Sequence, residues 1–95
     1  MKFTFFGHAA GYLETGSDKF IFDPFLTGNP KASVRATQVN PTYILLTHGH
    51  GDHVGDSVAI SKRTGAPVVT LSQTPWVVRR FKRDRPNAMP PWAFQ

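Results

Sequence analysis

The order of elements in the middle of the chain constrains the fold more than any other feature of the sequence. The run TYILLTH at 42–48 has a continuous apolar centre, YILL, which is typical of a strand covered on both faces. DSVAISKRTG at 56–65 predicts a helix, with Asp56 as its N-cap and Gly65 just past its end. APVVTL at 66–71 predicts a second buried strand. A strand, a helix and a strand in this order predict a βαβ unit, and therefore a parallel pair of strands.

The segment ahead of this unit predicts a meander of short strands. KFTFFG at 2–7 is strand-like, GYLET at 11–15 alternates weakly, and the apolar residues 20–22 form a strand that Asp23 and the following proline end. Residues 26–41 are polar and contain two prolines and a glycine, so we expect a loop. The predicted fold class is therefore α/β, with a strand meander followed by a βαβ unit.

A cluster of metal-ligating residue types follows the apolar run at 42–48. Three of the four histidines of the chain, His48, His50 and His53, lie there together with Asp52. Residues two apart on extended backbone point to the same side, so His48 and His50 can reach one ion. The intervening glycines allow a sharp turn, after which Asp52 and His53 can face a second ion. Since ligands usually bind at the carboxyl ends of strands in α/β units, we predict a metal site rather than a solvated loop.

The rest of the composition limits the metal and the compartment. The chain has no cysteine, so its ligands are histidine and carboxylate, which favours a divalent cation such as zinc, with manganese or iron as alternatives. No apolar run approaches the roughly 18 residues that span a bilayer. The apolar run at the N-terminus is also too short for a secretory signal. We therefore expect a cytoplasmic protein that does not bind a membrane.

Three stretches resemble a known family. THGHGDHVGD resembles the H-x-H-x-D-H signature of the metallo-β-lactamase superfamily, and FFGHAAGYLETG and KFIFDPFLTGNP are similar to one branch of it. That branch comprises the metal-dependent hydrolases related to the ascorbate-6-phosphate lactonases. The resemblance covers about residues 1–70 and implies the N-terminal half of an αββα sandwich. It also implies that a metal-activated water hydrolyses an ester, lactone or phosphoester of a small molecule.

The resemblance implies a role for each residue of the cluster. His48 and His50 would bind the first of two ions, and Asp52 and His53 would bind the second. Asp52 would also be catalytic, because it would orient the attacking water. The family site needs further ligands from downstream, namely a third histidine, a bridging aspartate and a late histidine. No histidine follows His53, so a catalytically inactive metal-binding fragment is the alternative to an active hydrolase.

Two earlier residues match positions that this branch keeps near the metals. His8 would lie at the site or on the substrate side, or would hydrogen-bond a carbonyl at a strand end. Asp23 would hold a ligand imidazole through its other ring nitrogen, or would cap its own turn.

Residues 71–95 differ in character from the rest of the chain. They contain five basic residues and one acidic residue, whereas residues 1–70 contain six and five. We therefore predict two parts: residues 1–70 as the N-terminal half of a metallo-hydrolase domain, and residues 71–95 as a basic tail. A truncation or frameshift is a hypothesis for the change. A proline at position 75 predicts the start of a short helix, on which Val77 and Phe81 share one face.

The basic tail also bears on the partners of the chain. We favour a solvated tail over a small nucleic-acid-binding module, so nucleic acid is not the expected partner. Strands that lack a partner sheet would expose apolar surface, and we therefore expect homo-oligomers.

Overall fold

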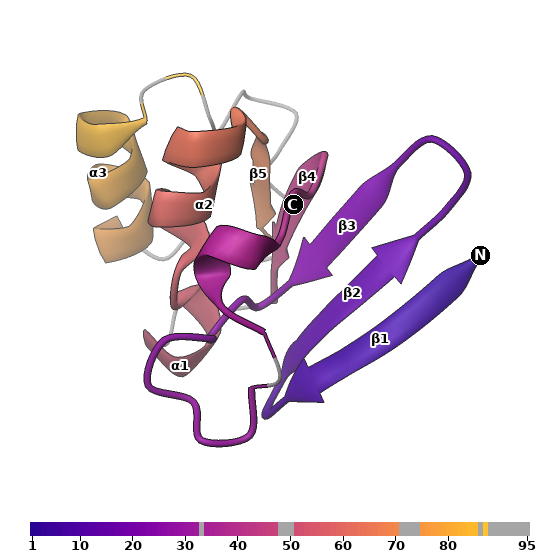
Figure 1. Cartoon of the computed structure of the whole chain (residues 1–95). Coiled ribbons are helices and arrows are strands. Elements are labelled where there is room, and N and C mark those ends of the chain that lie inside the picture. Colours follow the sequence, from indigo (N-terminus) through magenta and orange to yellow (C-terminus); the bar gives the residue numbers. More distant parts are fainter. Residues whose placement is uncertain (33, 48–50, 71–74, 86, 88–95) are drawn as a thin grey trace.

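The computed structural model describes residues 1–32, 34–47, 51–70, 75–85 and 87, within which five strands form one mixed sheet (Figure 1). The strands are β1 (Lys2–Gly7), β2 (Ala10–Glu14), β3 (Lys19–Phe22), β4 (Tyr43–Leu46) and β5 (Val68–Thr70), and they lie in this order across the sheet. β1, β2 and β3 are antiparallel neighbours, whereas β3, β4 and β5 are parallel neighbours. The predicted meander, the parallel pair and the α/β fold class are confirmed.

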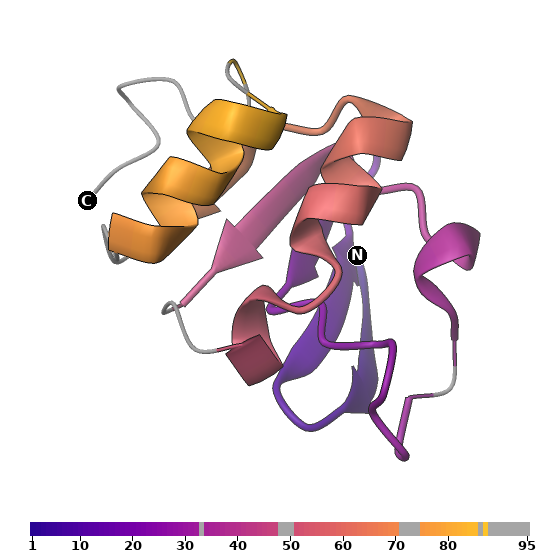
Figure 2. The ribbon, with the colours of Figure 1, turned by 90° about the vertical axis from the view of Figure 1, so that its left-hand side faces the viewer.

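The helices of the described residues lie on one face of the sheet (Figures 1 and 2). They are the 3₁₀ turn η1 (Ala36–Gln38), α1 (Gly51–Val54), α2 (Ser57–Thr64) and α3 (Pro75–Asp84). Gly65 ends α2 as expected, with φ of 78° and an N–H group that donates to the Ser61 carbonyl at 2.8 Å. None of the described helices is long and apolar enough to cross a membrane.

The core lies between this helical layer and the sheet. Alternate strand residues point toward the helices and are buried, and they include Ile21, Ile44 and Val68 at 0% exposure. The remaining core side chains come from the helices and the loops, among them Val58, Ile60 and Phe81.

The opposite face of the sheet is only partly covered in the described residues. Tyr43 and Leu45 of β4 are half-buried, and so are Phe20 and Phe22 of β3. The expectation that the strand at 42–48 is covered on both faces is therefore wrong for the described residues, whose helices pack against the other face. Phe3 and Phe5 of β1 extend the same face and are 60% and 63% exposed.

α3 packs against the body of the protein. Phe81 is only 1% exposed, and the Arg85 Nε donates to the Ser61 hydroxyl of α2 at 3.1 Å. The predicted helix after the proline at position 75 is confirmed. The expectation of a solvated tail does not hold for Phe81 and Arg85.

Candidate metal centre

Strand direction brings three of the predicted site residues to one edge of the sheet. β1 and β3 are both antiparallel to β2, and β4 is parallel to β3, so all three strands end at the same edge. His8 follows β1, Asp23 follows β3, and His53 lies in α1 shortly after β4. The ring centroids of His8 and His53 are 5.5 Å apart. Residues that are distant in the sequence therefore meet where α/β sheets usually bind ligands.

Asp23 is the most connected of these residues. It is 2% exposed, and its Oδ1 accepts the Thr47 N–H at 2.7 Å. Its Oδ2 accepts the Thr47 hydroxyl at 2.6 Å and lies 3.1 Å from His53 Nδ1. A buried carboxylate needs such donors to offset its lost hydration. The carboxylate therefore joins β4 and α1, whereas a turn-capping aspartate would bond to its own turn. Sequence reasoning did not identify Thr47, although its place directly after the strand was a usable signal.

The backbone of Asp23 is also unusual. Its φ is 44°, in the left-handed region that aspartate tolerates better than most residues. Its N–H still donates to the Leu45 carbonyl at 2.9 Å, so it continues the β3–β4 ladder. His8 is the other non-glycine residue with positive φ, at 55°, among those the structure describes. Strained backbone of this kind clusters at functional sites, which supports a site at this edge.

The hydrogen bond to Asp23 determines the tautomer of His53. A carboxylate only accepts hydrogen bonds, so Nδ1 of the neutral His53 ring carries the hydrogen. Nε2 is then the nitrogen through which His53 would bind an ion. Metal-ligating histidines usually donate their other ring nitrogen to a carboxylate or a carbonyl, so this pair fits a divalent cation. His8 also packs edge-on against Phe25, at 5.7 Å between ring centroids and 76° between planes.

The loop after Asp23 is held against the junction of α1 and α2. Asp56 Oδ2 accepts the N–H groups of Leu26 at 3.1 Å and Thr27 at 2.7 Å. The Asp56 N–H donates to the Pro24 carbonyl at 2.9 Å. Asp56 does precede α2, but the expected side-chain cap is absent, because its carboxylate bonds to this loop instead.

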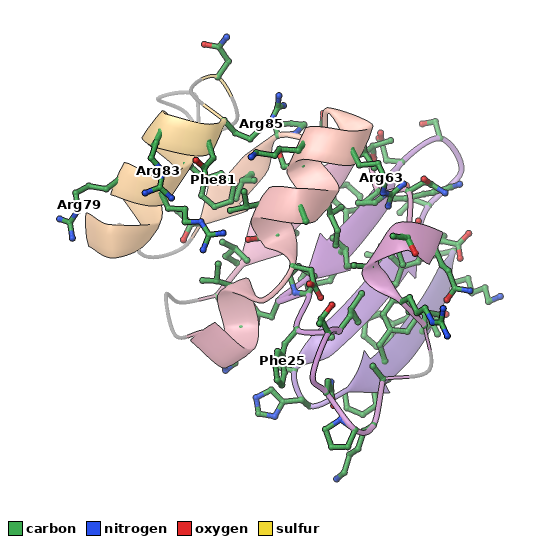
Figure 3. All side chains as sticks on the ribbon, turned by 60° about the vertical axis from the view of Figure 1, so that its left-hand side comes forward. Phe25, Arg63, Arg79, Phe81, Arg83 and Arg85 are labelled. Carbon is green, nitrogen blue, oxygen red and sulfur yellow. The ribbon has the colours of Figure 1, made fainter. Side chains whose placement is uncertain are left out.

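Gly55 allows the loop to approach this closely. Its φ is 46°, and a Cβ at this position would lie 2.5 Å from both the Phe25 Cα and the Pro24 carbonyl oxygen. Only glycine fits there without moving the loop. Phe25 in turn reaches the edge where His8 lies (Figure 3).

Part of the predicted ligand set lies outside the described residues. This applies to His48 and His50, and to the side chain of Asp52, whose backbone belongs to α1. Among the side chains that the structure does describe, no group of three histidine or acidic residues could hold an ion. The ligand assignment therefore stays a prediction, whereas the contact between Asp23 and His53 is observed.

Comparison with known proteins defines the class of this chain. The family described as the metallo-beta-lactamase superfamily matches residues 3–74, and the chain belongs to this superfamily. Within it, the chain is similar to proteins named UPF0173 metal-dependent hydrolases. The protein from Carboxydothermus hydrogenoformans is 58% identical over 69 residues, which are 73% of this chain and 30% of that protein. The protein from Archaeoglobus fulgidus is 52% identical over 81 residues, which are 85% of this chain and 35% of that protein.

A solved structure shows the same fold. Igni18, described as a novel metallo hydrolase from the hyperthermophilic archaeon Ignicoccus hospitalis, superposes with a TM-score of 0.71 and 28% sequence identity. The match covers 85% of this chain and 35% of Igni18. The chain thus spans about a third of the length of its relatives, and its fold is consistent with the N-terminal half of the superfamily fold.

Proposed function

We propose that this chain carries the first part of the metal site of a metal-dependent hydrolase. The observation that carries the proposal is the hydrogen bond from His53 Nδ1 to the buried carboxylate of Asp23. The pair lies at the sheet edge where the histidine cluster follows β4. Relatives that share more than half of the aligned residues are named metal-dependent hydrolases.

In this proposal, His48 and His50 bind one divalent ion, while Asp52 and His53 bind a second. Zinc is the first choice, because histidine and carboxylate ligands suit it, with manganese and iron as alternatives. When bound, such ions acidify a water molecule and polarise a carbonyl or phosphoryl oxygen.

The residues of the chain itself then position the reacting groups. Asp23 keeps His53 in one tautomer and one ring orientation, so it is a positioning residue. Asp52 orients the attacking water as a hydrogen-bond acceptor. His8 lies beside His53 and packs against Phe25, so we assign it to the substrate side of the centre. The substrate class that we propose is a small ester, lactone or phosphoester, following the resemblance to the lactonase-related branch.

The metal content of the purified chain tests the site. We expect zinc or manganese to be retained after dialysis, as measured by inductively coupled plasma mass spectrometry, and to be lost in His53→Ala. Asp23→Asn should weaken retention by about tenfold, because the ligand imidazole loses its carboxylate partner. The matched control is Asp18→Asn, which makes the same change in the β2–β3 turn. Equal metal content in all four proteins would contradict the site.

Metal binding without turnover is the second candidate function. The observation that favours it is the lack of any histidine after His53 in a chain that spans about a third of its relatives. Hydrolysis of a chromogenic phosphodiester and of a simple lactone separates the two candidates. Metal-dependent turnover that Asp52→Asn abolishes supports the hydrolase, whereas retained metal without turnover supports the second candidate.

A further inference from the structure

We infer that the outer surface of α2 and α3 is a docking site for the phosphate backbone of a nucleic acid. The surface consists of Lys62 from the last turn of α2 and of Arg79, Arg80 and Arg83 from α3, and we call these four residues the basic face. All four are exposed.

The basic face is a fixed surface, because α3 is anchored at two points. Phe81 is buried at 1% exposure, and Figure 3 shows it between α3 and α2 while Arg79 points away from the body. Arg85 donates to the Ser61 hydroxyl of α2, and that hydroxyl donates to the Ala66 carbonyl at 2.8 Å. The arginines are therefore presented from a helix with a defined orientation.

Asp84 organises the arginines of the basic face. Its carboxylate bonds to Arg83 Nε at 2.9 Å and to Arg80 Nε at 3.3 Å, so it holds the two guanidinium groups close together. The hydrogen bond with Arg83 is the main reason that the pKa of Asp84 falls to about 2, and the charge of Lys62 acts in the same direction. Three cations of the basic face, Arg80, Arg83 and Lys62, thus act on this one carboxylate. Planar guanidinium groups bind phosphate in a bidentate manner, which suits a polyphosphate backbone.

The side chains that the structure describes on α3 favour a nucleic acid over a membrane surface. A helix that binds a bilayer needs an exposed apolar face as well as a basic face. The apolar Phe81 is instead turned into the core, and the exposed side chains described for α3 are Arg79, Arg80 and Arg83. Lys62 lies in the last turn of α2, at the end away from α1, and this part of the basic face therefore lies away from the candidate metal centre.

Fluorescence anisotropy with a labelled DNA duplex of about 20 base pairs tests this inference directly. The variant Arg79→Gln/Arg83→Gln should bind about tenfold or more weakly at about 0.1 M salt. The slope of log K against log salt should decrease by about 2, since each lost phosphate contact removes about one unit. The matched control, Lys2→Gln/Arg35→Gln, has the same net charge and should change affinity by less than about twofold.

A second pair of variants predicts a gain of binding. Asp84→Asn removes the carboxylate that contacts Arg80 and Arg83 and should strengthen duplex binding about threefold or more. Asp18→Asn changes the net charge equally in the β2–β3 turn and should have a smaller effect. The aspartate variants still test duplex binding if the arginine variants fold poorly. Thermal unfolding followed by circular dichroism would reveal such poor folding.

Three outcomes would overturn the inference. The first is an equal effect of the basic-face variants and their controls, which would show that net charge alone governs binding. The second is the absence of duplex binding by the unmodified chain. The third is arginine-dependent binding to phosphatidylserine vesicles without binding to the duplex, which would assign the surface to membranes.

Discussion

Asp23 connects residues that lie 24 and 30 positions away in the sequence. A substitution at Asp23 therefore tests how much these hydrogen bonds contribute to the stability of the fold. Asp23→Asn keeps the size of the side chain, and asparagine also tolerates positive φ. Its amide nitrogen, however, donates where a carboxylate oxygen accepted, so Thr47 or His53 must either change from donor to acceptor or lose its hydrogen bond. We expect the free energy of unfolding in urea to fall by about 2–3 kcal/mol, the typical cost of an unsatisfied buried group.

Asp18→Asn is the control for this substitution, because the contact of the Asp18 carboxylate within the described part of the chain is an exposed one of 3.5 Å with the Thr42 hydroxyl. Its cost should stay within about 0.5 kcal/mol. Equal losses of stability in the two variants would mean that the buried hydrogen bonds of Asp23 do not matter for folding.

Tyr12 predicts a pH dependence of stability. Burial raises the pKa of its hydroxyl, the charge of Glu14 raises it further, and a hydrogen bond with the Asn40 backbone opposes both. The folded protein therefore holds this proton more tightly than the unfolded chain does. The corresponding stability is fully present below a pH of about 10 and is lost as the pH rises through the raised value. Urea unfolding between about pH 9 and pH 11 should show a steeper loss of stability in the unmodified chain than in Tyr12→Phe.

At the scale of elements, two glycines with positive φ allow a matched comparison. A Cβ at Gly55 would collide with the loop after β3, whereas a Cβ at Gly65 would meet nothing within 4 Å. Gly65→Ala should therefore cost only about 1 kcal/mol for its left-handed backbone. Gly55→Ala should cost about 3 kcal/mol or more, because the loop must also move. Chemical denaturation of the two variants measures the difference, and equal costs would contradict the close approach.

The elements differ in how well the sequence predicted them. Apolar runs and turn residues predicted the strands and α2 within about two residues, because hydrophobic periodicity and turn-forming residues are local properties of the sequence. The use of Asp56 was predicted incorrectly, because a carboxylate ahead of a helix can cap it or bond elsewhere. Which N–H groups the carboxylate binds depends on those that the tertiary fold brings near it, and here they are the N–H groups of Leu26 and Thr27. The burial of Phe81 against the body of the protein was also not predicted, because it too depends on the tertiary fold.

The candidate site shows the same division between local and tertiary information. The spacing of His48, His50 and His53 predicted a cluster, and this stays a prediction for the residues outside the described part. The sequence offered two roles for Asp23, and only the folded structure shows that its carboxylate reaches His53. The positive φ of His8 and Asp23 has no signature in the sequence, since both residues are more common with ordinary backbone.

At the scale of the whole molecule, the partly uncovered face of the sheet predicts self-association. Phe3 and Phe5 are exposed at 60% and 63%, and the half-buried Phe20 stacks on Tyr43 with 5.4 Å between ring centroids. Apolar surface of this kind favours burial against a second copy of the chain. Light scattering coupled to size-exclusion chromatography should show oligomers, and Phe3→Thr/Phe5→Thr should shift them toward monomer. A monodisperse monomer for the unmodified chain would contradict this prediction.

The backbone N–H of Asp23 pairs with β4, while its side chain binds Thr47 just beyond the end of the same strand. A slip of one residue between β3 and β4 would reverse which side chains face the helices, and would carry the carboxylate away from both Thr47 and His53. The contacts of Asp23 with Thr47 and His53 can therefore form only when β3 and β4 pair in their native register. Cation uptake at the proposed centre during refolding would report when that alignment is reached, and the proposal predicts weaker binding by misaligned chains.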